Sequence, residues 1–131
     1  MDISVTGMIG KRAEKAKLIE AAEFFAAQLM DPRMVRNLTL DIEVWKNFDL
    51  EGECVDEDGT KNPRWFTIGL KNQNIEEMIK VLGHEMVHVK QLAKGILKNK
   101  QNGVNIWAGK RYTNKIAYLD MPWEIEAFSK Q

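Results

Sequence analysis

Apolar side chains recur every three or four positions in two long segments, and this helical period predicts the two main helices of the chain. The first segment covers residues 13–30 and should end before Pro32, because proline disfavours helical geometry at the preceding residue. The second covers residues 74–94, where Asn74 can cap the first turn and Glu77 completes a capping box. The buried stripe of this second helix would consist of Ile75, Met78, Ile79, Leu82, Met86, Val89 and Ala93.

Strict alternation of apolar and polar residues predicts a half-buried strand at residues 38–45. Two further strands are expected at residues 51–55 and 64–70, separated by a turn rich in aspartate and glycine. Strands joined by short connections favour an antiparallel meander. Beyond the second helix, residues 98–103 are expected to form a polar loop and residues 104–119 a short hairpin.

A last helix is expected from Pro122 to Ser129, because proline is favoured at the first helical position. The whole pattern predicts an α+β fold with a small antiparallel or mixed sheet, a central helix, an N-terminal helix and a C-terminal helix. A chain of 131 residues can bury one core, so we expect a single domain spanning residues 1–131.

Charge and hydropathy argue against several classes of partner. The chain has 19 lysines and arginines and 19 aspartates and glutamates, so no net field attracts nucleic acid or an anionic membrane. No apolar run suits a signal peptide or a membrane span. The single cysteine, Cys54, cannot form an internal disulfide, which fits a reducing compartment. We therefore expect a cytoplasmic protein without a membrane or nucleic-acid partner.

The central helix carries the candidate chemistry in the run His84-Glu85-Met86-Val87-His88. Two imidazoles four residues apart lie about 40° out of register on a helix, so both can reach one metal ion. Glu85 is about 100° around the helix from His84 and could instead take a proton from a metal-bound water. Gly83, just before the motif, leaves room for another segment to approach.

A catalytic zinc site needs a third protein ligand, and the chain has no other histidine. The candidates are Glu124 and Glu126, which lie on nearly opposite sides of the last helix. We favour Glu124 as the third metal ligand, because Ala127 then shares its face and allows close approach to the histidine helix. Glu126 is the reserve.

These residues resemble those of a known family. The run HEMVH followed by VKQ, the later WAGKRY and the closing PWEIEAF are similar to small zincin metallopeptidases of the glutamate-zincin type, especially phage-encoded members. The resemblance covers about the last 60 residues. In related glutamate zincins a Glu, two residues, an Ala and usually an Asp or Asn follow one another, and Glu124 and Ala127 match this pattern. Phe128 replaces the final polar residue, so Gln91 or Asp120 would have to orient a histidine.

The motif and the resemblance together imply a zinc-dependent metallopeptidase, in which Glu85 activates a zinc-bound water to hydrolyse a protein or peptide substrate. The resemblance further implies a minimal zincin-like fold, in which the small sheet packs on the histidine helix. Its edge strand would hold the substrate in extended form, a role that would suit residues 64–70. A phage origin would place the protein in the host cytoplasm. The oxyanion of the reaction needs a donor, for which Tyr118, Tyr112 and Arg111 are the candidates.

Other conspicuous residues are better explained by packing or solvation. The four tryptophans could line a groove, but aromatic residues near strands usually supply core area. The lysines at 94, 98 and 100 suit a solvated loop, because no stacking pattern for nucleic acid surrounds them. Cys54 has no histidine outside the motif to activate it as a nucleophile.

Two rival functions stay open at this point. The first is a catalytically inactive, zinc-dependent protein-binding domain of the same fold, and the second is an interaction domain without any metal.

Overall fold

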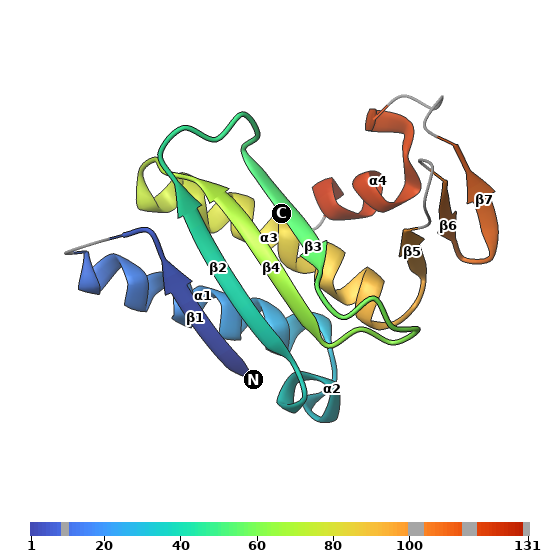
Figure 1. The fold of residues 1–131 in the computed structure, drawn as a ribbon, viewed down its shortest axis with the longest axis horizontal. Helices are drawn as coiled ribbons and strands as arrows, with labels where there is room; N and C mark the ends of the chain where they lie inside the picture. The colour runs from blue at the N-terminus through green and yellow to red at the C-terminus, as the bar shows by residue number, and fades with distance from the viewer. Residues whose placement is uncertain (9–10, 100–103, 114–117, 130–131) are drawn as a thin grey trace.

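The computed structural model describes residues 1–8, 11–99, 104–113 and 118–129, which form an α+β fold (Figure 1). The described residues contain four α-helices, one 3-10 helix and two sheets. The helices are α1 (Arg12–Leu29), α2 (Pro32–Arg36), α3 (Ile75–Ala93) and α4 (Pro122–Ser129), with the 3-10 helix η2 (Tyr118–Asp120) before α4. The larger sheet contains β1 (Asp2–Thr6), β2 (Thr39–Trp45), β3 (Gly52–Asp56) and β4 (Trp65–Lys71), and the smaller one β5 (Leu97–Asn99), β6 (Asn105–Trp107) and β7 (Lys110–Tyr112).

The strands of the larger sheet run in the order β1-β2-β4-β3, so the expected antiparallel meander is wrong. The strand β4 lies between β2 and β3, pairing parallel with the first and antiparallel with the second. The reason is burial. The side chains of Phe66, Ile68 and Leu70 on β4 are fully buried, and a strand in the middle of the sheet has a neighbouring strand along each edge. The more polar β3 is left at the edge. The strand β1, which the alternation did not reveal, pairs parallel with β2 at the other edge.

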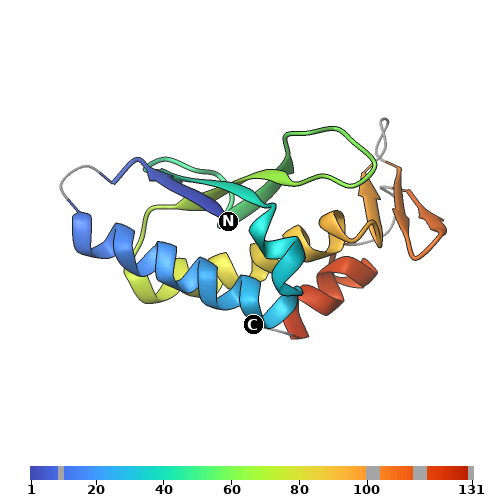
Figure 2. The ribbon, with the colours of Figure 1, turned by 90° about the horizontal axis from the view of Figure 1, so that it is seen from below.

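Two helices cover one face of this sheet, as Figure 2 shows with the sheet above and the helices below. The hydrophobic core lies between these layers and contains the alternating residues Leu40, Ile42 and Val44 of β2. Both predicted helices are confirmed, and the side chain of Asn74 accepts a hydrogen bond of 2.9 Å from the Glu77 amide as expected of the N-cap. The buried stripe of α3 includes Met78, Leu82, Met86 and Val89.

A glycine lets α1 and α3 approach each other. A Cβ at Gly83 would lie 3.0 Å from Cζ of Phe25 on α1, so the close contact expected before the histidine motif is present. It fixes α3 against the neighbouring helix at the turn that carries His84.

The smaller sheet stands beyond the end of α3, next to α4 (Figure 1). The strands β6 and β7 form the expected hairpin, and the two residues between them, Ala108 and Gly109, both have positive φ, as a tight hairpin turn requires. The rest of that expected segment at residues 114–117 lies outside the described residues. The polar loop expected at 98–103 is wrong at its start, because Lys98 belongs to β5, which pairs with β6. None of the described helices has the length and apolar character needed to cross a membrane.

Candidate metal centre

The two histidines of α3 and a glutamate of α4 converge on one point. His84 Nε2 lies 2.9 Å from Glu124 Oε1, and His88 Nε2 lies 3.1 Å from the same oxygen. Each of the three residues offers a ligand atom, and these atoms lie within 4.8 Å of one another. All three side chains are buried, with exposed fractions between 4% and 8%. Two imidazoles and a carboxylate are donor types that a divalent metal ion accepts, so the group could hold one.

The start of α4 decides which glutamate faces the histidines. Pro122 is the first residue of α4. In the first turn Glu124 points toward α3, on the same face as Ala127, which is fully buried. Glu126 contacts other residues of α3, and its Oε1 lies 3.3 Å from Lys90 Nζ and 3.0 Å from Gln91 Nε2. The structure therefore brings Glu124, and not Glu126, to the histidines.

The charges of this cluster support each other. Burial alone would raise the pKa of Glu124, but hydrogen bonds from His84 and His88 outweigh it and lower the pKa to about 2. Burial opposes the charged form of His88, yet the hydrogen bond to Glu124 outweighs this and raises the pKa of His88. Glu124 is thus an ionised carboxylate that its polar neighbours stabilise, and a cation bound between the three residues could stabilise the same charge.

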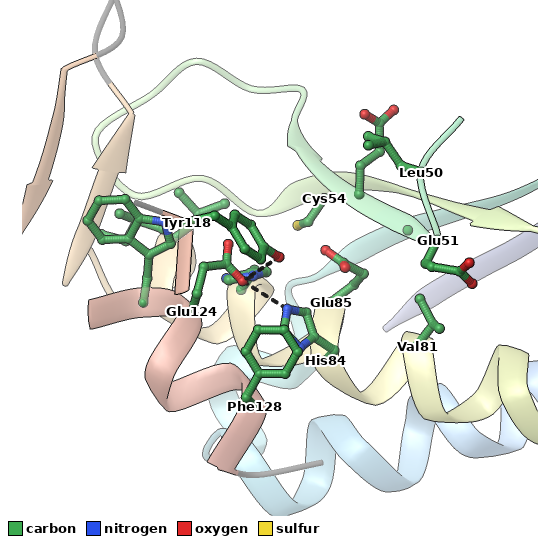
Figure 3. A pocket seen from close by; sticks show the side chains of 15 residues that line it. Leu50, Glu51, Cys54, Val81, His84, Glu85, Tyr118, Glu124 and Phe128 are labelled. Atoms are coloured by element: carbon green, nitrogen blue, oxygen red, sulfur yellow. Dashed lines mark hydrogen bonds and ion pairs between the residues drawn. The ribbon is translucent and has the colours of Figure 1, made fainter. Parts of the chain in front are cut away.

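Glu85 stands beside the cluster and does not join it. Its side chain points toward the start of β3 (Figure 3), where a Cβ at Gly52 would lie 3.2 Å from Glu85 Oε2. It is 6% exposed, and burial raises its pKa, although the neighbouring histidines pull the pKa back. A carboxylate with a raised pKa is suited to accept a proton and to release it again.

A cleft of about 580 Å³ opens in front of these residues, between α3, α4 and β3 (Figure 3). Its wall on the sheet side is the edge strand β3. The strand at residues 64–70, expected to be the edge, is paired on both sides and lies inside the sheet. Of the four tryptophans, only Trp123 is among the described residues that line the cleft. The lining consists of Leu50, Glu51, Gly52, Glu53, Cys54, Val81, His84, Glu85, His88, Leu92, Leu97, Tyr118, Trp123, Glu124 and Phe128.

Only one of the two candidate tyrosines reaches the cleft lining. The Tyr118 hydroxyl donates a hydrogen bond of 3.0 Å to Glu124 Oε1. Tyr112 packs its ring against Trp123 with centroids 5.7 Å apart, on the side of the smaller sheet. Arg111 is exposed on β7. The structure therefore brings Tyr118 to the candidate centre, and Tyr112 takes part in packing.

Phe128 covers one of the histidines. Its ring centroid lies 4.5 Å from that of His84, in an edge-on arrangement. The glutamate-zincin pattern has a polar residue at this position. In this chain an aromatic ring lies against the imidazole instead.

Gln91 hydrogen bonds directly to the second histidine. Its Oε1 lies 2.8 Å from His88 Nδ1, which is the contact expected of a residue that orients a ligand. The alternative candidate, Asp120, is exposed at the end of η2.

The close approach of Gly52 was missed at the sequence level. A Cβ at this position would lie 3.2 Å from Glu85 Oε2 and 2.5 Å from Val81 Cγ1. A glycine inside a predicted strand is a signal of close backbone approach, and this signal was present at position 52.

Comparison with known proteins yields no relative: no protein-family model, no curated protein and no solved structure matches this chain. The case for the centre therefore rests on its own geometry.

Proposed function

We propose that this chain is a zinc-dependent metallopeptidase with a minimal zincin-like fold. One observation carries the proposal: His84, His88 and Glu124 present three ligand atoms within 4.8 Å of one another. The carboxylate of Glu85 stands next to this cluster, in the same cleft. Two histidines and a glutamate leave a tetrahedral zinc ion one open position, as catalytic zinc sites require.

A bound zinc ion would polarise the scissile carbonyl and would lower the pKa of a water molecule at the open position. Glu85 takes one proton from the attacking water as its oxygen bonds to the carbonyl carbon. When the carbon–nitrogen bond breaks, Glu85 passes this proton to the leaving amine. The raised pKa of Glu85, caused first by burial, suits both transfers.

Tyr118 is the proposed donor to the developing oxyanion. Burial and the negative charge of Glu124 raise the pKa of its hydroxyl, so the hydroxyl keeps its proton at neutral pH. The residue lines the cleft and its hydroxyl already lies 3.0 Å from a ligand oxygen of the cluster. A neutral donor next to the reacting carbonyl can stabilise negative charge there.

Replacement of Glu85 by glutamine tests the proposal. The Glu85→Gln variant should keep its zinc but lose about 10²–10⁴-fold in hydrolysis of a denatured protein, because a general base contributes that much. Glu53→Gln is the matched control, since Glu53 is an exposed carboxylate that lines the same cleft. Turnover in Glu85→Gln equal to that of wild type would refute the assignment.

Elemental analysis of protein purified without chelator tests the ion. One zinc per chain should be found in wild type and be lost in His84→Ala. Two histidines and one carboxylate also suit iron(II), so iron in place of zinc would redirect the proposal to oxygen chemistry. Protein without any metal would favour an interaction domain.

A second candidate is a zinc-dependent protein-binding domain without turnover. The observation that favours it is Phe128, whose ring lies against His84 at the cleft and narrows access to that ligand. Bound zinc without any hydrolysis of denatured protein would select this function over the peptidase.

A further inference from the structure

The side-chain amide of Gln91 connects the histidine helix to the helix that carries Glu124. It is completely buried. Its Oε1 lies 2.8 Å from His88 Nδ1, and its Nε2 donates two hydrogen bonds of 3.0 Å, one to the Trp123 carbonyl oxygen and one to Glu126 Oε1. Every polar atom of the amide therefore has a partner, and the partners lie on both α3 and α4.

The partners fix which way the amide points. A backbone carbonyl carries no proton, so the Trp123 oxygen can only accept. Glu126 is paired with Lys90 at 3.3 Å and accepts as well. Both acceptors require the NH₂ group of Gln91, so its oxygen must face His88. A flipped amide would place its oxygen against the Trp123 carbonyl oxygen and against Glu126 Oε1, with no hydrogen between them.

The orientation of the amide in turn fixes the proton on His88. An amide oxygen only accepts, so Nδ1 of His88 must be the donor. A neutral imidazole with its proton on Nδ1 has its lone pair on Nε2, and Nε2 is the atom that lies 3.1 Å from Glu124 Oε1. The Trp123 carbonyl thus determines, through Gln91, which nitrogen of His88 is available to a metal ion.

We infer that Gln91 is a positioning residue, which selects the tautomer of His88 that binds metal through Nε2 and holds α4 so that Glu124 faces the same ion. The inference rests on the metal site of the proposed function but does not require peptide hydrolysis. Gln91 acts through His88 and α4, because it is not among the residues that line the cleft.

Nuclear magnetic resonance of the zinc-loaded wild type tests the tautomer directly. The chain has only two histidines, so few ring signals need assignment. The His88 ring should show zinc on Nε2 and a slowly exchanging proton on Nδ1. Zinc on Nδ1, or an Nδ1 proton that exchanges as fast as that of a free imidazole, would overturn the inference.

Zinc titrations of three variants separate orientation from packing. Gln91→Met keeps an unbranched side chain but offers no hydrogen bond, and it should bind zinc about 10–100-fold more weakly than wild type. Glu126→Gln is the matched control, because it alters an α4 partner of Gln91 while the Trp123 carbonyl still fixes the amide. Its zinc affinity and its His88 tautomer should stay as in wild type.

The double variant Gln91→Glu with Glu126→Gln supplies the rescue. A carboxylate at position 91 accepts from Nδ1, and the amide at position 126 can donate to it, but no donor then faces the Trp123 carbonyl oxygen. Part of the zinc affinity lost in Gln91→Met should return. An equal loss in Glu126→Gln and Gln91→Met, or no loss in Gln91→Met, would overturn the inference.

The outcomes distinguish this inference from the proposed function. Should Gln91→Met not fold, the wild-type spectrum and the double variant still decide. Zinc binding and the expected tautomer without hydrolysis would remove the peptidase and leave the role of Gln91 standing. A wild type that binds no zinc would remove both.

Discussion

The carboxylate of Glu85 has room because residue 52 on the facing strand is a glycine. Strand β3 passes over α3 at Gly52, and a Cβ there would lie 3.2 Å from Glu85 Oε2 and 2.5 Å from Val81 Cγ1. The shorter of these distances is below any real contact, so the Val81 side chain would have to shift. The added methyl group would also press on Glu85 Oε2 and displace the carboxylate.

Substitution of Gly52 by alanine should therefore impair the proposed hydrolysis without loss of the metal. A displacement of a catalytic group by about 1 Å can cost about 10²-fold in rate, and we expect kcat to fall toward that value. Zinc content should stay at the wild-type level, because the atoms nearest to the added methyl group belong to Val81 and Glu85.

The control for Gly52→Ala is Val55→Ala, a substitution at an exposed position of the same strand. It should leave both kcat and zinc content unchanged. A Gly52→Ala variant with wild-type kcat would show that Glu85 does not depend on this close approach.

At this scale the sequence predicted the residues of one helix far better than the contacts between elements. His84, His88 and Glu85 follow from the period of a single helix, which depends on a few neighbouring residues. Glu124 was favoured over Glu126 through the position of Ala127, and the structure brings Glu124 to the histidines. The approach of Gly52 to Glu85 depends on where β3 lies relative to α3. A glycine inside a strand signals a close approach, but it does not say which residue approaches.

At the scale of elements, α4 is the part that completes the candidate centre. It has only eight residues and is held through Trp123 and Ala127, both buried. Ala127 is fully buried on the face of Glu124, so the volume of its side chain determines how closely the ligand approaches the histidines.

Replacement of Ala127 by leucine should move Glu124 away from the histidines. The larger side chain overfills a packed contact, which we expect to cost about 1–3 kcal/mol of stability. Zinc affinity should fall together with it, because the third ligand is displaced. Isothermal titration with zinc and thermal unfolding of the metal-free protein measure the two effects separately.

Ser129→Leu adds the same side chain at an exposed position of α4 and serves as the comparison. It should leave zinc affinity unchanged. Equal zinc binding by Ala127→Leu and wild type would mean that the position of α4 does not depend on this contact.

The arrangement of the strands could be predicted less well than their existence. Alternation revealed β2, because a half-buried strand has a period of two, and the turn between them indicated β3 and β4. Neither signal specifies which strands are neighbours. The insertion of β4 between β2 and β3 follows from the burial of its apolar residues on assembly of the whole sheet. The strand β1 has five residues and lies at an edge with partly exposed alternate positions, so its pattern is weak.

At the scale of the whole molecule, the candidate centre joins α3 and the larger sheet to α4 and the smaller sheet. The histidines belong to α3, which packs on the larger sheet, and Glu124 belongs to α4, which stands beside the smaller sheet (Figure 1). An ion bound by all three would add a connection between these parts. It would also neutralise part of the charge of a carboxylate that is 7% exposed.

Removal of the metal should therefore destabilise the protein, and first of all the attachment of α4. Zinc at 100 times its Kd would stabilise the folded state by about 2.7 kcal/mol, because it binds the assembled site. For a domain of this size such a difference corresponds to a decrease in Tm on the order of 10 °C when a chelator is added. Hydrogen exchange should show the loss of protection in α4 before the central strands β2 and β4, since these lie in the core. The His84→Ala variant should unfold at one temperature with and without chelator. If wild type also shows no chelator effect, or if β2 loses protection together with α4, then the ion does not hold α4 to α3 and the larger sheet.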